Sequence, residues 1–600
     1  MASCFIVMIT RQKIIVYSCL LLCLTVMLFC SERKQPIAYT TEFVENNLKA
    51  FEVAITKLSE EANKSEISES ELKEKFLEAR SVYKKIEFYI EYFFPASSRV
   101  INGVPIAEIE LGENFIEPPG GLQVIEDYIY NPIGAEEKKE LENEINKLAL
   151  VIKKINLYQK EYIITDEQLF DAIRLEIFRI TALGITGFDT PLSLHALPET
   201  SLALEGLKKV LSQYQYHEKV KKQIESAQDF ISKENDFNQF DRLAFITNYL
   251  QPLSLALHQQ RKQLNLDTVE SSAALYNDAI SLFQENAFNP NKFVGNYTEF
   301  LTQEKILLGE KLFNDKVLSG ANNISCASCH HENKAFTDGL KTAKGLSKNN
   351  LLRNTPTLLY AGFQRGFFYD LKAGSLEDQA LDVVHHKDEM DGSLQEISKK
   401  VQQQTAYKKL FKMAYENEEI TPWKIQHALA SYVRSLAPFS SRFDKYMRGD
   451  KTQLSDVEKR GFNLFTGKAK CATCHFMPLF NGTPAPLFDK TEVEVLGVPL
   501  TPDTVNAKID TDLGKYALNK YNQYLYAFKT PTLRNIAKTA PYMHNGVYKD
   551  LNQVMDFYNR GGGAGLGIAL DNQTLLDTKL NLSASEINDI ISFMKTLNDE

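Results

Sequence analysis

Two copies of one cysteine–histidine motif, CxxCH, lie 145 residues apart in the second half of the chain. Their residues are Cys326, Cys329 and His330 in the first copy and Cys471, Cys474 and His475 in the second. Two thiols three positions apart on one turn can each add to a vinyl group of one haem, and the next residue then places a histidine under the iron. Paired zinc motifs usually lie about 15–20 residues apart, and a thioredoxin-like motif needs a βαβ context that the sequence lacks. We therefore predict two covalently bound haem c groups.

The four remaining cysteines all lie in the first 30 residues, so nothing is left to build a disulfide framework. In this region Arg11 and Lys13 precede an apolar run that stops at Cys30. This layout is typical of a signal peptide over 1–30, and it predicts export to the periplasm. A single membrane anchor and lipid attachment at Cys30 remain open alternatives.

The region around each motif is an internal repeat. The segment "LGEKLFNDKVLSGANNISCASCHHENKAFTDG" compares with "RGFNLFTGKAKCATCHFMPLFNG", and "NTPTLLYAG" compares with "KTPTLRNIA". The histidines of the motifs are 145 residues apart and the TPTL strings 175. The second copy therefore carries an insertion of about 30 residues within 477–527.

The repeat also indicates which iron is open. An offset of 175 residues aligns Val383 with Tyr558. A phenolate oxygen can coordinate ferric haem, whereas a valine cannot. If this is the distal position in both copies, the second haem is closed by Tyr558 and the first is open. The residues alone favour a packed aromatic at Tyr558 over a ligand, and Met543, His544 and Met555 are rival ligands.

Composition and periodicity bound the rest of the molecule. The 600 residues are 44% hydrophobic and 24% charged, which indicates two to four globular domains. A net charge of −9 without a basic tract argues against a nucleic-acid partner. Residues 37–285 place apolar side chains at helical spacing, 285–298 reads as a linker, and short helices and loops follow from 299. We expect a mainly α protein.

The signature stretches "RNTPTLLYAGFQRGFFYD", "SLEDQALDVVHHKDEM" and "FKTPTLRNIAKTAPYMHNG" resemble the bacterial di-haem cytochrome c peroxidase family, which includes the MauG enzymes. The resemblance covers roughly 299–600. It implies two tandem cytochrome c-like haem domains, which would follow the N-terminal helical bundle that the periodicity of 37–285 predicts. The first, 299–445, would be the peroxidatic domain, and the second, 446–600, the electron-transfer domain.

The resemblance also implies roles for the residues around the first haem. Gln379 and Glu389 match the distal glutamine and catalytic glutamate of the family, and Tyr558 matches its second-haem ligand, a tyrosine in MauG. Ordinary members carry a histidine between the first motif and the TPTL string, but none lies between His331 and Thr355 here. We therefore expect the first iron to be open in the resting enzyme.

Two further matches concern the region between the haems. Tyr369 stands where the family has a tryptophan, which bears on the electron route. Asn354, with the backbone carbonyls of Thr539 and Pro541, matches an inter-haem calcium site. We therefore expect a calcium ion there.

The N-terminal half is similar to imelysin-like helical domains through "GGLQVIEDYIY". The G-x-H-x-x-E motif of those domains appears as Gly121, Gln123 and Glu126, with glutamine in place of histidine. We therefore expect a docking or spacer role for the 37–285 domain rather than metal binding.

These resemblances imply a periplasmic di-haem peroxidase, tethered by lipid if Cys30 is acylated. It would reduce hydrogen peroxide with electrons from a small redox protein, a cytochrome c or a cupredoxin. A MauG-like oxidase of a protein side chain is the main alternative. A non-enzymatic dihaem electron-transfer protein is the second, although it leaves Gln379 and Glu389 unexplained.

Overall fold

The computed structural model describes residues 35–600 except 106–107, 110–115, 132–133, 271–273, 295–296, 348 and 418. The predicted signal segment 1–30, with Cys30, lies outside the described residues. The chain is mainly helical, as expected. No helix in the described part of the chain is long and apolar enough to cross a membrane.

The N-terminal half is a helical bundle with a small β1–β2 hairpin (Glu108–Ile109 and Ile116–Glu117). Its helices are α2 (Pro36–Ala62), α3 (Glu69–Lys84), α4 (Glu87–Phe93), α5 (Pro95–Asn102), α6 (Leu122–Tyr130), α7 (Ala135–Tyr158), α8 (Asp166–Ala182), α9 (Ala196–Leu211), α10 (Glu218–Lys233), α11 (Arg242–Phe245) and α12 (Gln251–Gln263). In α2 the buried side chains Val44, Leu48, Phe51 and Ile55 recur every three or four residues, which aligns them on one face of the helix.

The bundle ends earlier than the sequence predicts. After α12 the described part of 264–302 contains no helix except a short 3₁₀ turn, Tyr297–Glu299, so residues 264–285 are not helical. This segment pairs with distant parts of the chain instead: the Ala274 amide donates to the Leu487 carbonyl at 2.9 Å. Tertiary contacts therefore override the local helical pattern here.

The C-terminal half consists of short helices joined by long loops. The helices are α13 (Gln303–Asn314), α14 (Leu376–His385), α15 (Leu394–Gln402), α16 (Thr405–Tyr415), α17 (Pro422–Ser435), α18 (Arg442–Met447), α19 (Asp456–Thr466), α20 (Leu551–Asn559), α21 (Gly562–Gly565) and α22 (Ala584–Lys595). The region of the predicted insertion contributes β3 (Val493–Val495), which pairs antiparallel with β4 (Ala527–Lys529).

The repeat seen in the sequence is visible in the fold. Helix α13 packs against α17 in the first copy, and α19 packs against α22 in the second. Helices α14 and α20 also correspond, and each begins at a capping side chain, Ser375 and Asp550.

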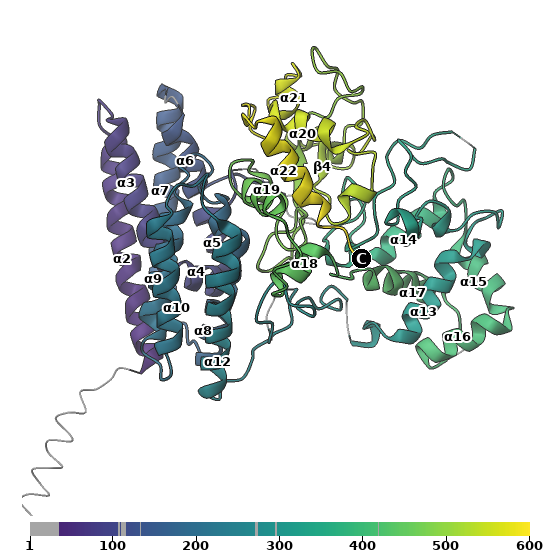
Figure 1. Cartoon of the computed structure of the whole chain (residues 1–600), viewed down its shortest axis with the longest axis horizontal. Helices are drawn as coiled ribbons and strands as arrows, with labels where there is room; N and C mark the ends of the chain where they lie inside the picture. Colours follow the sequence, from purple (N-terminus) through teal and green to yellow (C-terminus); the bar gives the residue numbers. More distant parts are fainter. Residues whose placement is uncertain are drawn as a thin grey trace, which may run out of the picture.

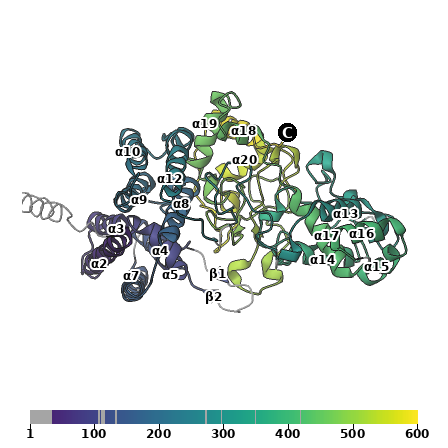
Figure 2. The same cartoon turned by 90° about the horizontal axis from the view of Figure 1, so that it is seen from below.

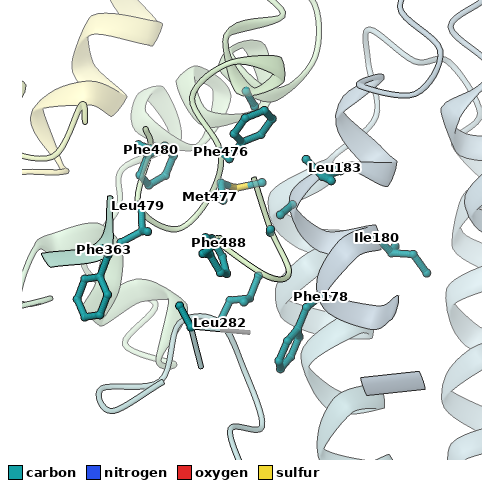
Figure 3. Packing of buried hydrophobic residues seen from close by; sticks show 14 of the residues in the cluster. Phe178, Ile180, Leu183, Leu282, Phe363, Phe476, Met477, Leu479, Phe480 and Phe488 are labelled. Atoms are coloured by element: carbon teal, nitrogen blue, oxygen red, sulfur yellow. The ribbon is translucent and has the colours of Figure 1, made fainter. Parts of the chain in front are cut away.

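Figures 1 and 2 show the three parts in a row: the bundle at one end, α18–α22 in the centre and α13–α17 at the other end. Helix α18 packs with the central part, because Asp444 pairs with Arg534 at 2.8 Å. The predicted boundary at 445 thus lies inside this helix. One hydrophobic core runs from the bundle into the central part, and in Figure 3 Phe178 and Leu183 face it from one side and Phe476 and Met477 from the other.

Candidate functional site

The first CxxCH motif forms a single tight turn. The 3₁₀ turn Cys326–Ser328 brings the His330 amide within 3.0 Å of the Cys326 carbonyl. The His330 Nδ1 lies 2.8 Å from the carbonyl oxygen of Phe336. A carbonyl can only accept, so Nδ1 is the protonated nitrogen and Nε2 keeps its lone pair for a metal. Phe336 reaches this position through a left-handed backbone conformation, with φ of 58°.

The second motif repeats this construction. The His475 amide lies 2.9 Å from the Cys471 carbonyl, and Nδ1 lies 3.1 Å from the Phe480 carbonyl. Phe480 is also left-handed, with φ of 51°. Burial lowers the pKa of His475 to about 4, so its imidazole is neutral at pH 7 and suited to coordinate iron. The two histidines are therefore oriented by equivalent phenylalanine carbonyls.

All four motif thiols are free. Burial raises the pKa of Cys326 and of Cys471 to about 12 in each case. A structural zinc site needs four ligands, and the described residues contain no cluster of His, Cys, Asp and Glu side chains that could hold a metal ion. The donor set therefore suits thioether attachment of haem better than a zinc site.

Glu389 lies close to the first motif. It is part of the loop after α14, and its carboxylate lies 3.6 Å from Nδ1 of His386. Burial raises the pKa of Glu389, while the neighbouring His386 and Lys372 oppose this rise. The loop that carries Glu389 contacts the segment before the motif, since the Gly320 amide donates to the Met390 carbonyl at 2.9 Å. Burial raises the pKa of the Cys329 thiol, and the charges of Asp338 and Glu389 raise it further.

Gln379 lies on α14, half-buried, and its backbone N–H donates to the Ser375 carbonyl at 3.0 Å. On the same helix Val383 is the eighth residue, and on α20 the eighth residue is Tyr558. The structure therefore gives Val383 and Tyr558 equivalent places in the two repeats.

Tyr558 lies close to the second motif. Burial raises the pKa of Tyr558 strongly, and the nearby Cys474 and Cys471 raise it further. Of the rival ligands, His544 is engaged elsewhere: its ring stacks on Phe528 at 3.7 Å, and its Nε2 lies 3.5 Å from Asp510. Met555 is buried in the core.

Tyr369 and Asn354 meet where the two repeats join. The Tyr369 hydroxyl donates to Oδ1 of Asn354 at 3.4 Å, and the Tyr369 carbonyl accepts from the Lys529 amide at 2.7 Å. The backbone N–H of Asn354 donates to the carbonyl of His544 at 2.7 Å. His544 lies three residues after Pro541 in the sequence. Asn354 is thus tied to the segment that carries Thr539 and Pro541, and a calcium ion between them stays a prediction.

The junction also contains charges that the sequence did not single out. Arg353 bridges the repeats, with Asp370 at 2.7 Å and Asp512 at 2.6 Å. Asp338 accepts from the Thr355 hydroxyl at 2.8 Å. His386 was also missed, although its position three residues before Glu389 is a usable signal.

In the bundle, the imelysin-like motif is part of the packing. The Gln123 side-chain amide donates to the Asn102 carbonyl at 3.0 Å, and Glu126 accepts from the Ser193 amide at 2.9 Å. Both side chains are buried.

Comparison with known proteins finds similarity over the second half of the chain. Residues 303–452 match the family described as di-haem cytochrome c peroxidase. Cytochrome-c peroxidase IdrP2 of Denitromonas iodatirespirans is 31% identical over 321 residues, 50% of this chain and 82% of that protein. The methylamine utilization protein MauG of Methylorubrum extorquens is 34% identical over 306 residues, 50% of this chain and 80% of that protein. A crystal structure of a MauG-like protein associated with microbial copper homeostasis is 31% identical, with a TM-score of 0.46 over 51% of this chain and 92% of that chain.

Proposed function

The chain belongs to the di-haem cytochrome c peroxidase family, and on this premise we propose that it reduces hydrogen peroxide to water with electrons from a small redox protein. One observation carries the proposal. The two CxxCH turns are built alike, but the helix position that holds Val383 in the first repeat holds the buried phenol of Tyr558, near the second turn, in the second repeat. Two haems attached in the same way but with different distal side chains fit one catalytic site and one electron-transfer site.

Both turns fit a covalently bound haem c, because each offers two free thiols and a histidine whose Nδ1 is fixed by a carbonyl. Cys326, Cys329 and His330 would hold the first haem, in a peroxidatic domain over 299–445. Cys471, Cys474 and His475 would hold the second, in an electron-transfer domain over 446–600. A bound haem supplies one-electron oxidation and reduction and a coordination position for a small ligand.

Glu389 would serve as the general acid–base of peroxide cleavage. Its carboxylate takes the proton from one peroxide oxygen and returns it to the other, so that the O–O bond breaks and water leaves. Burial raises its pKa towards neutrality, which suits both halves of this transfer. The Gln379 amide would orient the peroxide by donating a hydrogen bond. Two electrons and two protons complete the conversion to two waters.

Tyr558 would be the second ligand, with His475, of the second iron. A buried phenol ionises only beside a positive centre, and ferric iron is one. Tyr369 lies at the junction of the repeats, where the electron route between the haems would pass. The proposal includes calcium held by Asn354, Thr539 and Pro541, a cytochrome c or cupredoxin as donor, and a periplasmic location. Lipid attachment at Cys30 is an alternative to a freely diffusing form.

A second candidate is oxidation of a protein side chain, as a MauG-like enzyme. The tyrosine beside the second motif and the lack of a histidine between His331 and Thr355 favour it. Steady-state assays with peroxide should separate the two candidates. Faster turnover with reduced cytochrome c would favour the peroxidase, and faster turnover with a protein substrate would favour the MauG-like oxidase.

Both candidate functions require two bound haems, and the haem content of the purified protein tests this requirement. An alkaline pyridine haemochrome assay should report two haems per chain, and Cys471→Ala should leave one. Bound zinc without haem would contradict the proposed function entirely.

A further inference from the structure

The N-terminal bundle packs directly beside the second CxxCH turn. The Phe188 ring lies edge-on to Phe476, one residue after His475, with centroids 5.4 Å apart. The side chain of Asn463 on α19 donates to Asp241 at 2.9 Å and accepts from the Leu243 amide at 3.0 Å. The bundle therefore forms part of the surroundings of the second haem site.

Lys470 is the charged link across this contact. It directly precedes Cys471 and has a left-handed backbone, with φ of 55°, which is unfavourable for a residue with a side chain. Its carbonyl accepts from the Thr473 hydroxyl at 2.7 Å and so holds the turn, while its Nζ donates to the Pro191 carbonyl of the bundle at 2.9 Å. At the same position of the first motif, Ser325 has an extended backbone and binds within its own turn. The contact of a lysine with the bundle is thus specific to the second motif.

Glu126 contacts the same bundle loop. Its Oε1 accepts from the amide of Ser193, two residues after Pro191. Its Oε2 is buried and, within the described part of the chain, has no hydrogen-bond partner. The two side chains therefore converge on the 191–193 loop, and the charge of Glu126 opposes the lowering of the Lys470 pKa by burial.

Burial raises the pKa of Glu126, and the charge of Arg80 lowers it. Arg80 binds Glu199 through two hydrogen bonds, of 2.5 and 2.8 Å. Such a bidentate pair is strong and largely self-compensating. Lys470, on the haem side of the contact, is a second cation that interacts with the charge of Glu126.

We propose that Glu126 and Lys470 form a charge pair across the bundle–haem contact and set the reduction potential of the second haem. The inference rests on the proposed function, since it requires haem at Cys471 and Cys474. Reduction removes one positive charge from the iron centre, so a nearby cation favours the ferrous state and a nearby anion the ferric state. Glu126 is buried and Lys470 is half-buried, so salt screens both charges less than it screens fully exposed ones, and both effects would reach the haem.

The test uses the full holoprotein in spectroelectrochemical titrations. Lys470→Met should lower the potential of the second haem and Glu126→Gln should raise it. Each should change the ferric-to-ferrous ratio at fixed potential about tenfold, which is about 59 mV for a one-electron couple. The double variant should return close to the wild-type value.

Two controls separate charge from packing. Lys470→Arg keeps the cation and should keep the potential. Lys468→Met removes a lysine that pairs with Glu586 of its own domain at 2.7 Å, and should shift the potential much less. A loosened contact would admit water and move both single variants in the same direction. That result, or unchanged potentials in variants that retain two haems, would overturn the charge pair and leave the proposed function standing. Absence of haem at the second motif would overturn both.

Discussion

At the scale of single residues, Glu389 has the surroundings of an acid–base catalyst. Burial raises its pKa above the ordinary 4.5, and His386 and Lys372 limit the rise. The carboxylate form must take the first proton, so kcat/KM should fall as the pH falls through the raised pKa. The acid limb of the pH profile should therefore lie above pH 4.5.

Glu389→Gln should slow peroxide turnover by about 10²–10⁴-fold, because the amide cannot carry the proton. It should also remove the acid limb of the profile. Stopped-flow and steady-state assays on protein with two haems check this. Glu396→Gln is the matched control, since Glu396 is exposed and pairs only with Lys399 among the described ion pairs. Full activity in Glu389→Gln would show that the assigned catalytic pocket is wrong.

Tyr558→Phe should change the ferric spectrum of the second haem, because the phenyl ring offers no ligand atom. Tyr558→Met should raise the potential of that haem, since thioether sulfur favours ferrous iron. Optical and resonance Raman spectra measure the ligand change. Tyr548→Phe is the control, because Tyr548 packs against Phe557 in the same region. Identical spectra in wild type and Tyr558→Phe would exclude the ligand assignment.

The repeat offset explains what sequence could predict at this scale. It paired Val383 with Tyr558, and the structure gives both the same place on equivalent helices. Lys470, in contrast, looks like any lysine beside a motif. Its partner Pro191 is 279 residues away in sequence, and only the fold reveals the contact.

At the scale of elements, the repeated G-x-x-LF motif is explained by helix packing. Gly309 on α13 faces α17, and a Cβ there would lie 1.9 Å from the Ala428 carbonyl. Gly461 on α19 faces α22, and a Cβ would lie 2.0 Å from the Asp589 carbonyl. Both helix pairs thus cross with their backbones nearly in contact, which only glycine permits.

Gly461→Ala should therefore force α19 away from α22. Overpacking of this kind costs about 1–3 kcal/mol. Urea denaturation followed by circular dichroism would measure the loss. Gly374→Ala is the control, because a Cβ at Gly374 meets nothing within 4 Å. Equal stability of the two variants would contradict the close-packing explanation.

Periodicity predicted the bundle helices well but not where they stop. Apolar spacing continues through 264–285, yet the described part of this segment bonds to both halves of the molecule, from Ala274 to Leu487 and from Ile280 to Ser254. Helical spacing of apolar residues indicates only that one side of a segment is buried. Contacts with distant parts of the chain decide which surface covers that side.

At the scale of the whole molecule, the bundle is built into the haem-binding half. A single hydrophobic core includes Phe178 and Leu183 of the bundle and Phe476 and Met477 beside the second motif (Figure 3). Helices α13–α17 lie at the far end of the row (Figure 2). Disturbing the bundle contact should therefore affect the second haem before the first.

Leu183→Asp tests this arrangement. Leu183 is 4% exposed, so the variant loses apolar packing and buries a carboxylate, at a cost of about 2–5 kcal/mol. The second haem should lose its native spectrum at a lower temperature than in wild type, while the first haem changes less. Leu150→Asp is the control, because Leu150 lies on α7 and is 67% exposed. If both variants melt like wild type, or if both haems respond equally to Leu183→Asp, the bundle is not coupled to the second haem through this core.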